Sequence, residues 1–209
     1  MRTRLRLDAM TGSAFAGWVA VIAQWSGPLL AQDLDLSWID HERLKTGEIL
    51  AEFGDDRRFK GHIRAAVLID APAERIWEIL EDCESAPEYV PNVLSCELRE
   101  TSKEQNSQVF RQRVKVAWFL PSFEHEFRLV YKPYSRIDVN RVSGPLSVLD
   151  GAWWLVPGPG RGTILTYYLD FDPGLPIPNF VVGRMLMRDV PVVLTAVRDR
   201  AEAAKSGAP

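Results

Sequence analysis

The segment Val67-Leu-Ile-Asp-Ala-Pro-Ala-Glu-Arg-Ile-Trp77 carries a strand directly into a helix. The apolar, β-branched run at its start is typical of a strand that is buried on both faces. Pro72 at the first helical position and Glu74 in the first turn predict a helix start, because proline suits that position and an acid suits the positive end of a helix. Ile76 and Leu80 then provide the apolar face of this helix.

The rest of the chain is organised around this strand and helix. We expect one strand before them, near residues 47–53, and a second short helix after them, near residues 84–91. A series of strands bounded by turn residues follows, at residues 93–99, 109–118, 123–132, 136–142, 149–156 and 163–171. Connections this short join neighbouring antiparallel strands, so the pattern predicts a meander.

A long helix is expected from Asn179 to about residue 204. Val182, Leu186 and Val190 begin a stripe of apolar residues at helical spacing. Pro191 lies within the stripe, and we expect it to kink the helix because proline removes one backbone hydrogen bond. The predicted fold class is α+β, with a curved antiparallel sheet wrapped around a long C-terminal helix.

The composition of the 209 residues narrows the class of protein. Hydrophobic residues make up 46% and charged residues 25%, which is ordinary for a globular domain. The net charge of −3 provides no positive field for phosphate backbones, so we expect no nucleic acid partner. The sequence has no cysteine spacing typical of a zinc site and no phosphate-binding or catalytic signature, so we expect neither a metal nor a cofactor.

The first 31 residues have the pattern of a signal peptide, with three arginines before a short apolar run at residues 14–23. A membrane-spanning helix needs about 20 apolar residues, so the shorter run favours export and cleavage over a membrane anchor. We therefore expect a periplasmic or secreted protein, with a signal peptide at 1–31, an N-terminal extension at 32–46 and a ligand-binding domain at 47–205.

The order of these elements, and particular residues within them, resemble the START/polyketide cyclase-dehydrase superfamily, whose helix-grip fold includes coenzyme Q-binding proteins. The segments that carry the resemblance are 67–77, Leu80-Glu-Asp82, Tyr89-Val-Pro-Asn-Val93, Asp150-Gly-Ala-Trp153 and Thr163-Ile-Leu-Thr-Tyr167. The resemblance covers residues 47–205. It implies an apolar cavity beneath the long helix, which in such families holds lipids, quinones, sterols or aromatic polyketides.

Alternation along two expected strands selects candidate residues for the wall of such a cavity. His125 shares the apolar face of the strand at 123–132, because side chains of a strand alternate between its two faces. Gln112 lies on the apolar face of the strand at 109–118, where a buried amide needs a partner from the protein or from a ligand. The candidate ligand-binding residues are Gln112, Val114, Trp118, His125, Phe127, Trp153, Tyr167 and Met185.

Two adjacent aromatic pairs lie on the last two expected strands, Trp153 with Trp154 and Tyr167 with Tyr168. One member of each pair should face inward, and alternation alone does not decide which. Aromatic side chains serve equally well in core packing and in pocket lining. Both roles therefore stay open for these strands.

The sequence also leaves the roles of Cys83, Cys96 and His125 open. The two cysteines form either a disulfide or two buried thiols, since spacing alone does not fix their geometry. His125 is a wall residue, a group that orients a ligand, or a general base, which would need a partner.

The predicted function is non-catalytic binding or transport of a hydrophobic small molecule, a lipid, quinone or terpenoid. The alternative is a cyclase or dehydratase that acts on an aromatic or polyketide-like substrate, with His125 as the acid or base. A third hypothesis is an interaction-only role with a protein partner, which the sequence does not name. Transient contact with a membrane also stays open, because apolar ligands are delivered from lipid.

Overall fold

The computed structural model describes residues 34–56, 59–115, 121–174 and 176–203, and a compact unit starts at Ser37. The expected signal peptide at 1–31 lies outside the described residues. The helices are α1 (His41–Lys45), α2 (Ala73–Glu81), the 3-10 helix η1 (Ala86–Glu88) and α3 (Asn179–Ala203). The strands are β1 (Leu50–Asp56), β2 (Phe59–Ile69), β3 (Val93–Ser102), β4 (Ser107–Val114), β5 (Phe123–Lys132), β6 (Arg136–Ser143), β7 (Val148–Pro157) and β8 (Thr163–Asp172).

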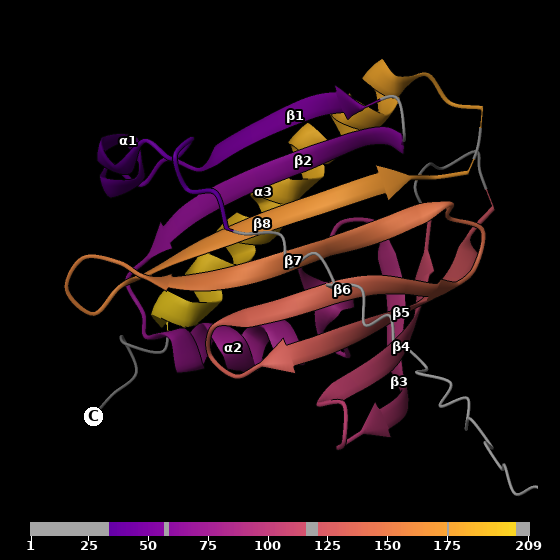
Figure 1. The fold of residues 1–209 in the computed structure, drawn as a ribbon, viewed down its shortest axis with the longest axis horizontal. Helices are drawn as coiled ribbons and strands as arrows, with labels where there is room; N and C mark the ends of the chain where they lie inside the picture. Colours follow the sequence, from indigo (N-terminus) through magenta and orange to yellow (C-terminus); the bar gives the residue numbers. More distant parts are fainter. Residues whose placement is uncertain (1–33, 57–58, 116–120, 175, 204–209) are drawn as a thin grey trace, which may run out of the picture. The chain divides into compact units, whose positions relative to one another are not determined.

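These strands form an eight-stranded sheet in the order β1-β2-β8-β7-β6-β5-β4-β3. Every pair of neighbours is antiparallel, and β3 to β8 form the expected meander. The sheet is curved, with α3 running along its concave side and α2 near one end (Figure 1). The predicted fold class, a curved sheet around a long C-terminal helix, is confirmed.

The residues of segment 67–77 behave largely as their sequence predicts. Val67 and Ile69 are fully buried in β2, and Ile76 is fully buried in α2. The expected helix start is one residue too early, because Pro72 has an extended backbone and lies at the N-cap, so the helix begins at Ala73. Proline still suits this place, since it has no backbone N–H that would need a partner.

The short helix α1 was not expected from the sequence. The side chain of Asp40 accepts hydrogen bonds from the backbone N–H groups of Glu42 and Arg43, at 3.0 and 3.2 Å. Such a cap satisfies N–H groups that the first turn of a helix leaves free. The helix buries Leu44, which is 1% exposed.

The long helix α3 packs its apolar stripe onto the sheet. Leu194 and Val197 are fully buried, and the backbone of α3 lies nearest β2, β1 and α2. The helix continues through Pro191. Because α3 lies close to one side of the sheet, its backbone does not cover the concave surface of β4 to β7.

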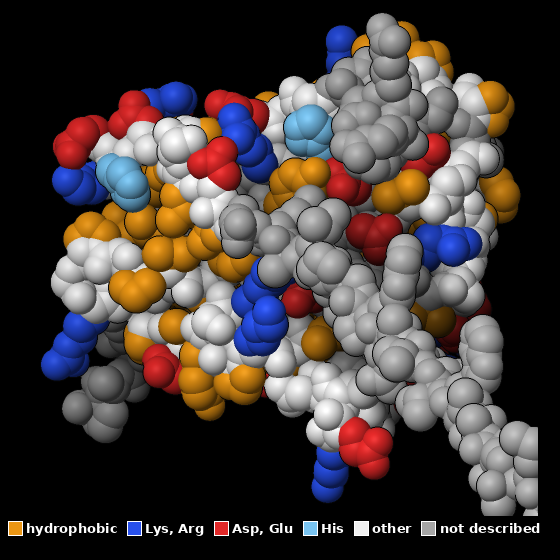
Figure 2. Space-filling view, in the orientation of Figure 1, with side chains coloured by type: hydrophobic (Ala, Val, Ile, Leu, Met, Phe, Trp, Pro, Cys, Tyr) orange, Lys and Arg blue, Asp and Glu red, His pale blue; other side chains and the backbone are white. Residues whose placement is uncertain are grey.

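The outer face of the sheet carries charged residues of both signs (Figure 2). Arg64 of β2 pairs with Glu52 of β1 at 2.6 Å, and Arg111 of β4 pairs with Glu126 of β5 at 3.1 Å. Exposed pairs of this kind contribute little to stability, typically about 0–1 kcal/mol. Because these pairs mix the two signs, the visible part of the outer face has no broad patch of a single charge.

Cys83 and Cys96 form a disulfide, with their Cα atoms 5.6 Å apart. It joins the segment just after α2 to β3 and so closes the chain that contains η1 into a loop. No helix in the described part of the chain is both long and apolar enough to cross a membrane.

We predict that the contact between α3 and the sheet dominates stability. Leu194→Ala should lower the free energy of unfolding by about 2–5 kcal/mol, because it leaves a cavity in a closely packed site. Val192 is 48% exposed on the same helix, so Val192→Ala should change it by less than about 0.5 kcal/mol. Denaturant unfolding followed by circular dichroism measures both values, and equal effects would contradict the assignment of this interface.

Candidate ligand-binding cavity

A cavity lies between α3 and the concave face of the sheet, in three adjoining compartments. The first has a volume of about 200 Å³ and the second about 190 Å³, and they share Val90, Gln112, His125 and Leu149. The third, about 50 Å³, adjoins the second at Met185 and ends at the loop before α3. The ligand pockets of proteins typically have volumes of about 300–1,000 Å³, so the compartments suit a small or slender ligand.

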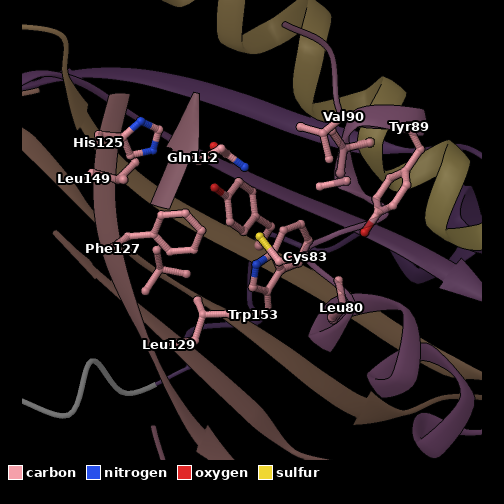
Figure 3. A pocket seen from close by; sticks show the side chains of 14 residues that line it. Leu80, Cys83, Tyr89, Val90, Gln112, His125, Phe127, Leu129, Leu149 and Trp153 are labelled. Carbon is pink, nitrogen blue, oxygen red and sulfur yellow. The ribbon is translucent and has the colours of Figure 1, made fainter. Parts of the chain in front are cut away.

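The first compartment is lined by side chains from α2, from the segment that follows it, from β4 to β8 and from α3 (Figure 3). None of the residues that line it is an aspartate, glutamate, lysine or arginine. The lining residues are Leu80, Cys83, Ala86, Tyr89, Val90, Gln112, His125, Phe127, Leu129, Val139, Leu149, Trp153, Tyr167 and Val193. An uncharged wall of this kind favours an apolar ligand, because a charged group would lose its hydration there.

Three polar side chains of this wall have no hydrogen-bond partner among the described residues. Gln112 and His125 lie directly opposite each other on β4 and β5, and Tyr167 lies on β8. The Nδ1 atom of His125 is buried and unpaired. Buried polar groups normally have partners, so these three groups are available to a polar group of a ligand.

Burial determines the protonation of these groups. His125 is 6% exposed, and its burial lowers the pKa of the imidazole from 6.5 to about 4. Burial raises the pKa of the Tyr167 hydroxyl, so that hydroxyl stays protonated and can donate. At neutral pH the wall therefore offers an amide, a neutral imidazole and a phenol, with no net charge.

The aromatic pairs that the sequence left open are divided between the two faces of the sheet. Trp153 and Tyr167 face the cavity as cross-strand neighbours, with ring centroids 3.9 Å apart and a 23° angle between the planes. Trp154 lies on the outer face beneath the guanidinium of Arg136. On the same face the Tyr168 hydroxyl donates a hydrogen bond to the Asp170 carboxylate. The stacked pair provides a flat, apolar surface inside the cavity.

The structure brings most of the candidate residues together. Gln112, His125, Phe127, Trp153 and Tyr167 line the first compartment, whereas Val114 and Met185 line the second. Trp118 lies outside the described residues.

Sequence reasoning missed the residues that α2, η1 and the following loop contribute, such as Leu80, Tyr89 and Val90. The sequence marks Tyr89 only as part of a segment, residues 89–93, that resembles the family. No periodicity marks residues of a loop as cavity wall, because loops have no regular alternation.

No cluster of His, Cys, Asp or Glu that could hold a metal ion is present in the part of the chain that the structure describes. The second compartment includes one acid, Asp189. Its carboxylate accepts a hydrogen bond from the Asn92 amide at 2.9 Å and pairs with Arg188 at 2.5 Å. It is therefore already occupied by two protein partners.

The chain belongs to the polyketide cyclase/dehydrase and lipid transport family, whose sequence profile matches residues 69–198. A STAR-related lipid transfer protein of Xanthomonas axonopodis has a similar fold, with a TM-score of 0.64 and 19% identity. The match covers 74% of this chain and 93% of that one. The Zhui aromatase/cyclase of a Streptomyces species is similar with a TM-score of 0.59 and 23% identity, over 68% and 93% of the two chains.

A third similar protein has a different kind of name. The ribosome association toxin RatA of Pseudomonas aeruginosa is 25% identical over 141 residues, which cover 68% of this chain and 95% of the toxin. The three relatives are named for lipid transfer, for cyclisation and for ribosome association. Membership of the family therefore covers lipid binding and cyclase roles without choosing between them, and the choice depends on the site.

We predict that His125 makes stability pH-dependent in acid. Its pKa is about 4 in the folded protein and 6.5 in an exposed histidine, so the unfolded chain binds more protons between these values. Stability from this group is complete above pH 6.5 and falls by up to about 3 kcal/mol as the pH drops towards 4. His125→Phe should remove this pH-dependent part of the stability. Unfolding curves at several pH values measure it. If the free energy of unfolding of the variant falls between pH 6.5 and 4 as steeply as that of the unaltered protein, the burial of a neutral imidazole is contradicted.

Proposed function

We propose that this protein binds and carries a hydrophobic small molecule, a lipid, quinone or terpenoid, without changing it chemically. The observation that carries this proposal is the uncharged first compartment beneath α3, which Gln112, His125 and Tyr167 line with polar groups and where the Nδ1 atom of His125 is buried without a partner. Removal of apolar surface from water supplies affinity, at about 25 cal/mol per Å². The three polar groups then orient one hydroxyl or carbonyl of the ligand.

The surroundings of His125 favour binding over catalysis. A general base works best with a pKa near the working pH, and burial places this one at about 4. The described residues of the first compartment include no carboxylate that could raise the pKa of His125 or orient its ring. A nucleophile activated by a neighbouring base is likewise missing from that lining.

A cyclase or dehydratase is the second candidate, because a neutral imidazole still faces the cavity beside a flat aromatic wall. Cyclisation of a linear polyketide thioester, followed through the absorbance of its aromatic product, tests it. As a carrier, the protein should give no product above the buffer rate. If the protein forms product and His125→Phe lowers the rate by about a hundredfold or more, the carrier proposal fails.

Access to the cavity and location in the cell form part of the same proposal. Phe180 and Val181, next to the third compartment, are 70% and 42% exposed. Such exposed apolar side chains support transient contact with a membrane from which the ligand is taken. Export to the periplasm or outside the cell is supported by the arginine-rich start of the sequence and by the disulfide, since disulfides persist in oxidising compartments.

We predict that filling the first compartment weakens binding while the fold survives. Phe127→Trp should raise the Kd for the fluorescent apolar probe N-phenyl-1-naphthylamine by about tenfold, because the larger ring takes ligand space. Val130→Trp adds the same ring on the outer face of β5 and should leave the Kd unchanged. Fluorescence titration and thermal melting measure both. A fall in melting temperature for Phe127→Trp with unchanged probe binding would mean that the site is filled core.

A further inference from the structure

A second hollow lies on the other side of the cavity wall, between α2 and the C-terminal end of α3. This outer groove has a volume of about 470 Å³ and is lined by Arg75, Glu78, Asp82, Ser85, Arg200 and Ala203, with Ile79 and Tyr89. Its lining is mostly polar, unlike the wall of the first compartment. It therefore offers a hydrophilic surface beside an apolar one.

Tyr89 lines both the groove and the first compartment, and it is the residue common to the two linings. In Figure 3 it lies across the cavity from His125, with its hydroxyl towards α2. That hydroxyl donates a hydrogen bond to the carbonyl oxygen of Ile79 at 3.1 Å. The ring lies 4.6 Å from the Arg200 guanidinium, which also pairs with Glu88 at 2.9 Å. Tyr89 therefore forms part of the wall between the apolar cavity and the polar groove.

The charged groups around the groove are balanced. Arg75 pairs with Glu78 at 2.9 Å, and Asp82 accepts a hydrogen bond from the Ser85 hydroxyl at 2.6 Å. The Nε atom of Arg75 is buried and has no partner among the described residues. Charges balanced in this way favour a hydrophilic group without net charge over an anion or a cation.

We propose that the outer groove binds the hydrophilic, uncharged or zwitterionic end of an amphiphilic ligand whose apolar part occupies the cavity. Tyr89 is the gate that rotates away to connect the two spaces. This inference rests on the proposed function, because it requires an apolar ligand in the cavity. It explains how compartments of limited volume would serve a ligand longer than themselves.

Two ligands with the same chain test the groove. Dodecylphosphocholine has a zwitterionic head and 1-dodecanol a hydroxyl only, and both are measured by displacement of N-phenyl-1-naphthylamine below their aggregation limits. Ala203 is exposed at the rim of the groove, so Ala203→Trp fills the groove without reaching the cavity. This variant should raise the Kd for dodecylphosphocholine by about tenfold and leave the Kd for dodecanol and for the probe unchanged. Ala203→Ser should leave all three Kd values unchanged.

The gate is tested by the rate of dodecylphosphocholine binding in stopped-flow displacement. Tyr89→Ala should accelerate it by about tenfold, and Tyr89→Phe, which keeps the ring and loses the bond to Ile79, should accelerate it less. If the probe does not bind the unaltered protein, the proposed function fails. If the probe binds but dodecylphosphocholine does not, the proposed function stands and the groove proposal is overturned. The same conclusion follows if Ala203→Trp weakens dodecylphosphocholine and dodecanol equally, or weakens neither. Equal rates in all three Tyr89 forms would overturn the gate.

Discussion

The packing of α3 against β1 and β2 is the contact on which the rest of the structure depends. Leu194 and Val197 fix the helix to one side of the concave face with no exposed surface. Among the described residues the backbone of α3 lies near β1 and β2 rather than β4 to β7, which curve away on the other side. The same contact that closes the core therefore also creates the space beneath the helix.

What that space can do follows from the side chains that were left without partners. A packed core would satisfy or exclude Gln112, His125 and Tyr167, because unpaired buried polar groups reduce stability. Here they face one compartment together and carry no charge at neutral pH. The disulfide between Cys83 and Cys96 holds the η1 segment on the edge of this compartment. The arrangement is suited to recognising a ligand by shape and by one polar group, rather than to activating it.

Much of the fold could be predicted from the sequence, because regular elements have regular patterns. The strand at 123–132 and the helix from Asn179 have the expected starts, since alternation and helical spacing mark them over many residues. The short helix α1 was missed because one capping side chain, Asp40, rather than an apolar stripe, determines it.

The site was less accessible to sequence reasoning than the fold. Alternation placed Gln112 and His125 on the inner face but could not choose between Trp153 and Trp154. These two are neighbours on one strand, and alternation is satisfied whichever of them faces inward. The pairing of β7 with β8 places Trp153 and Tyr167 on one face, and the cavity lining shows that this is the inner face. Tyr89 reaches the cavity from a loop, and only the fold brings it beside α3.

The proposed function requires an apolar ligand to occupy the cavity beneath α3. Its most direct test is a ¹H–¹⁵N spectrum of the tryptophan indole groups during titration with N-phenyl-1-naphthylamine. We expect the Trp153 signal to shift until the site is saturated, while the signal of Trp154, next to it on the outer face, stays in place. A Trp154 signal that shifts while Trp153 stays fixed, or two signals that never move, would contradict an internal binding site.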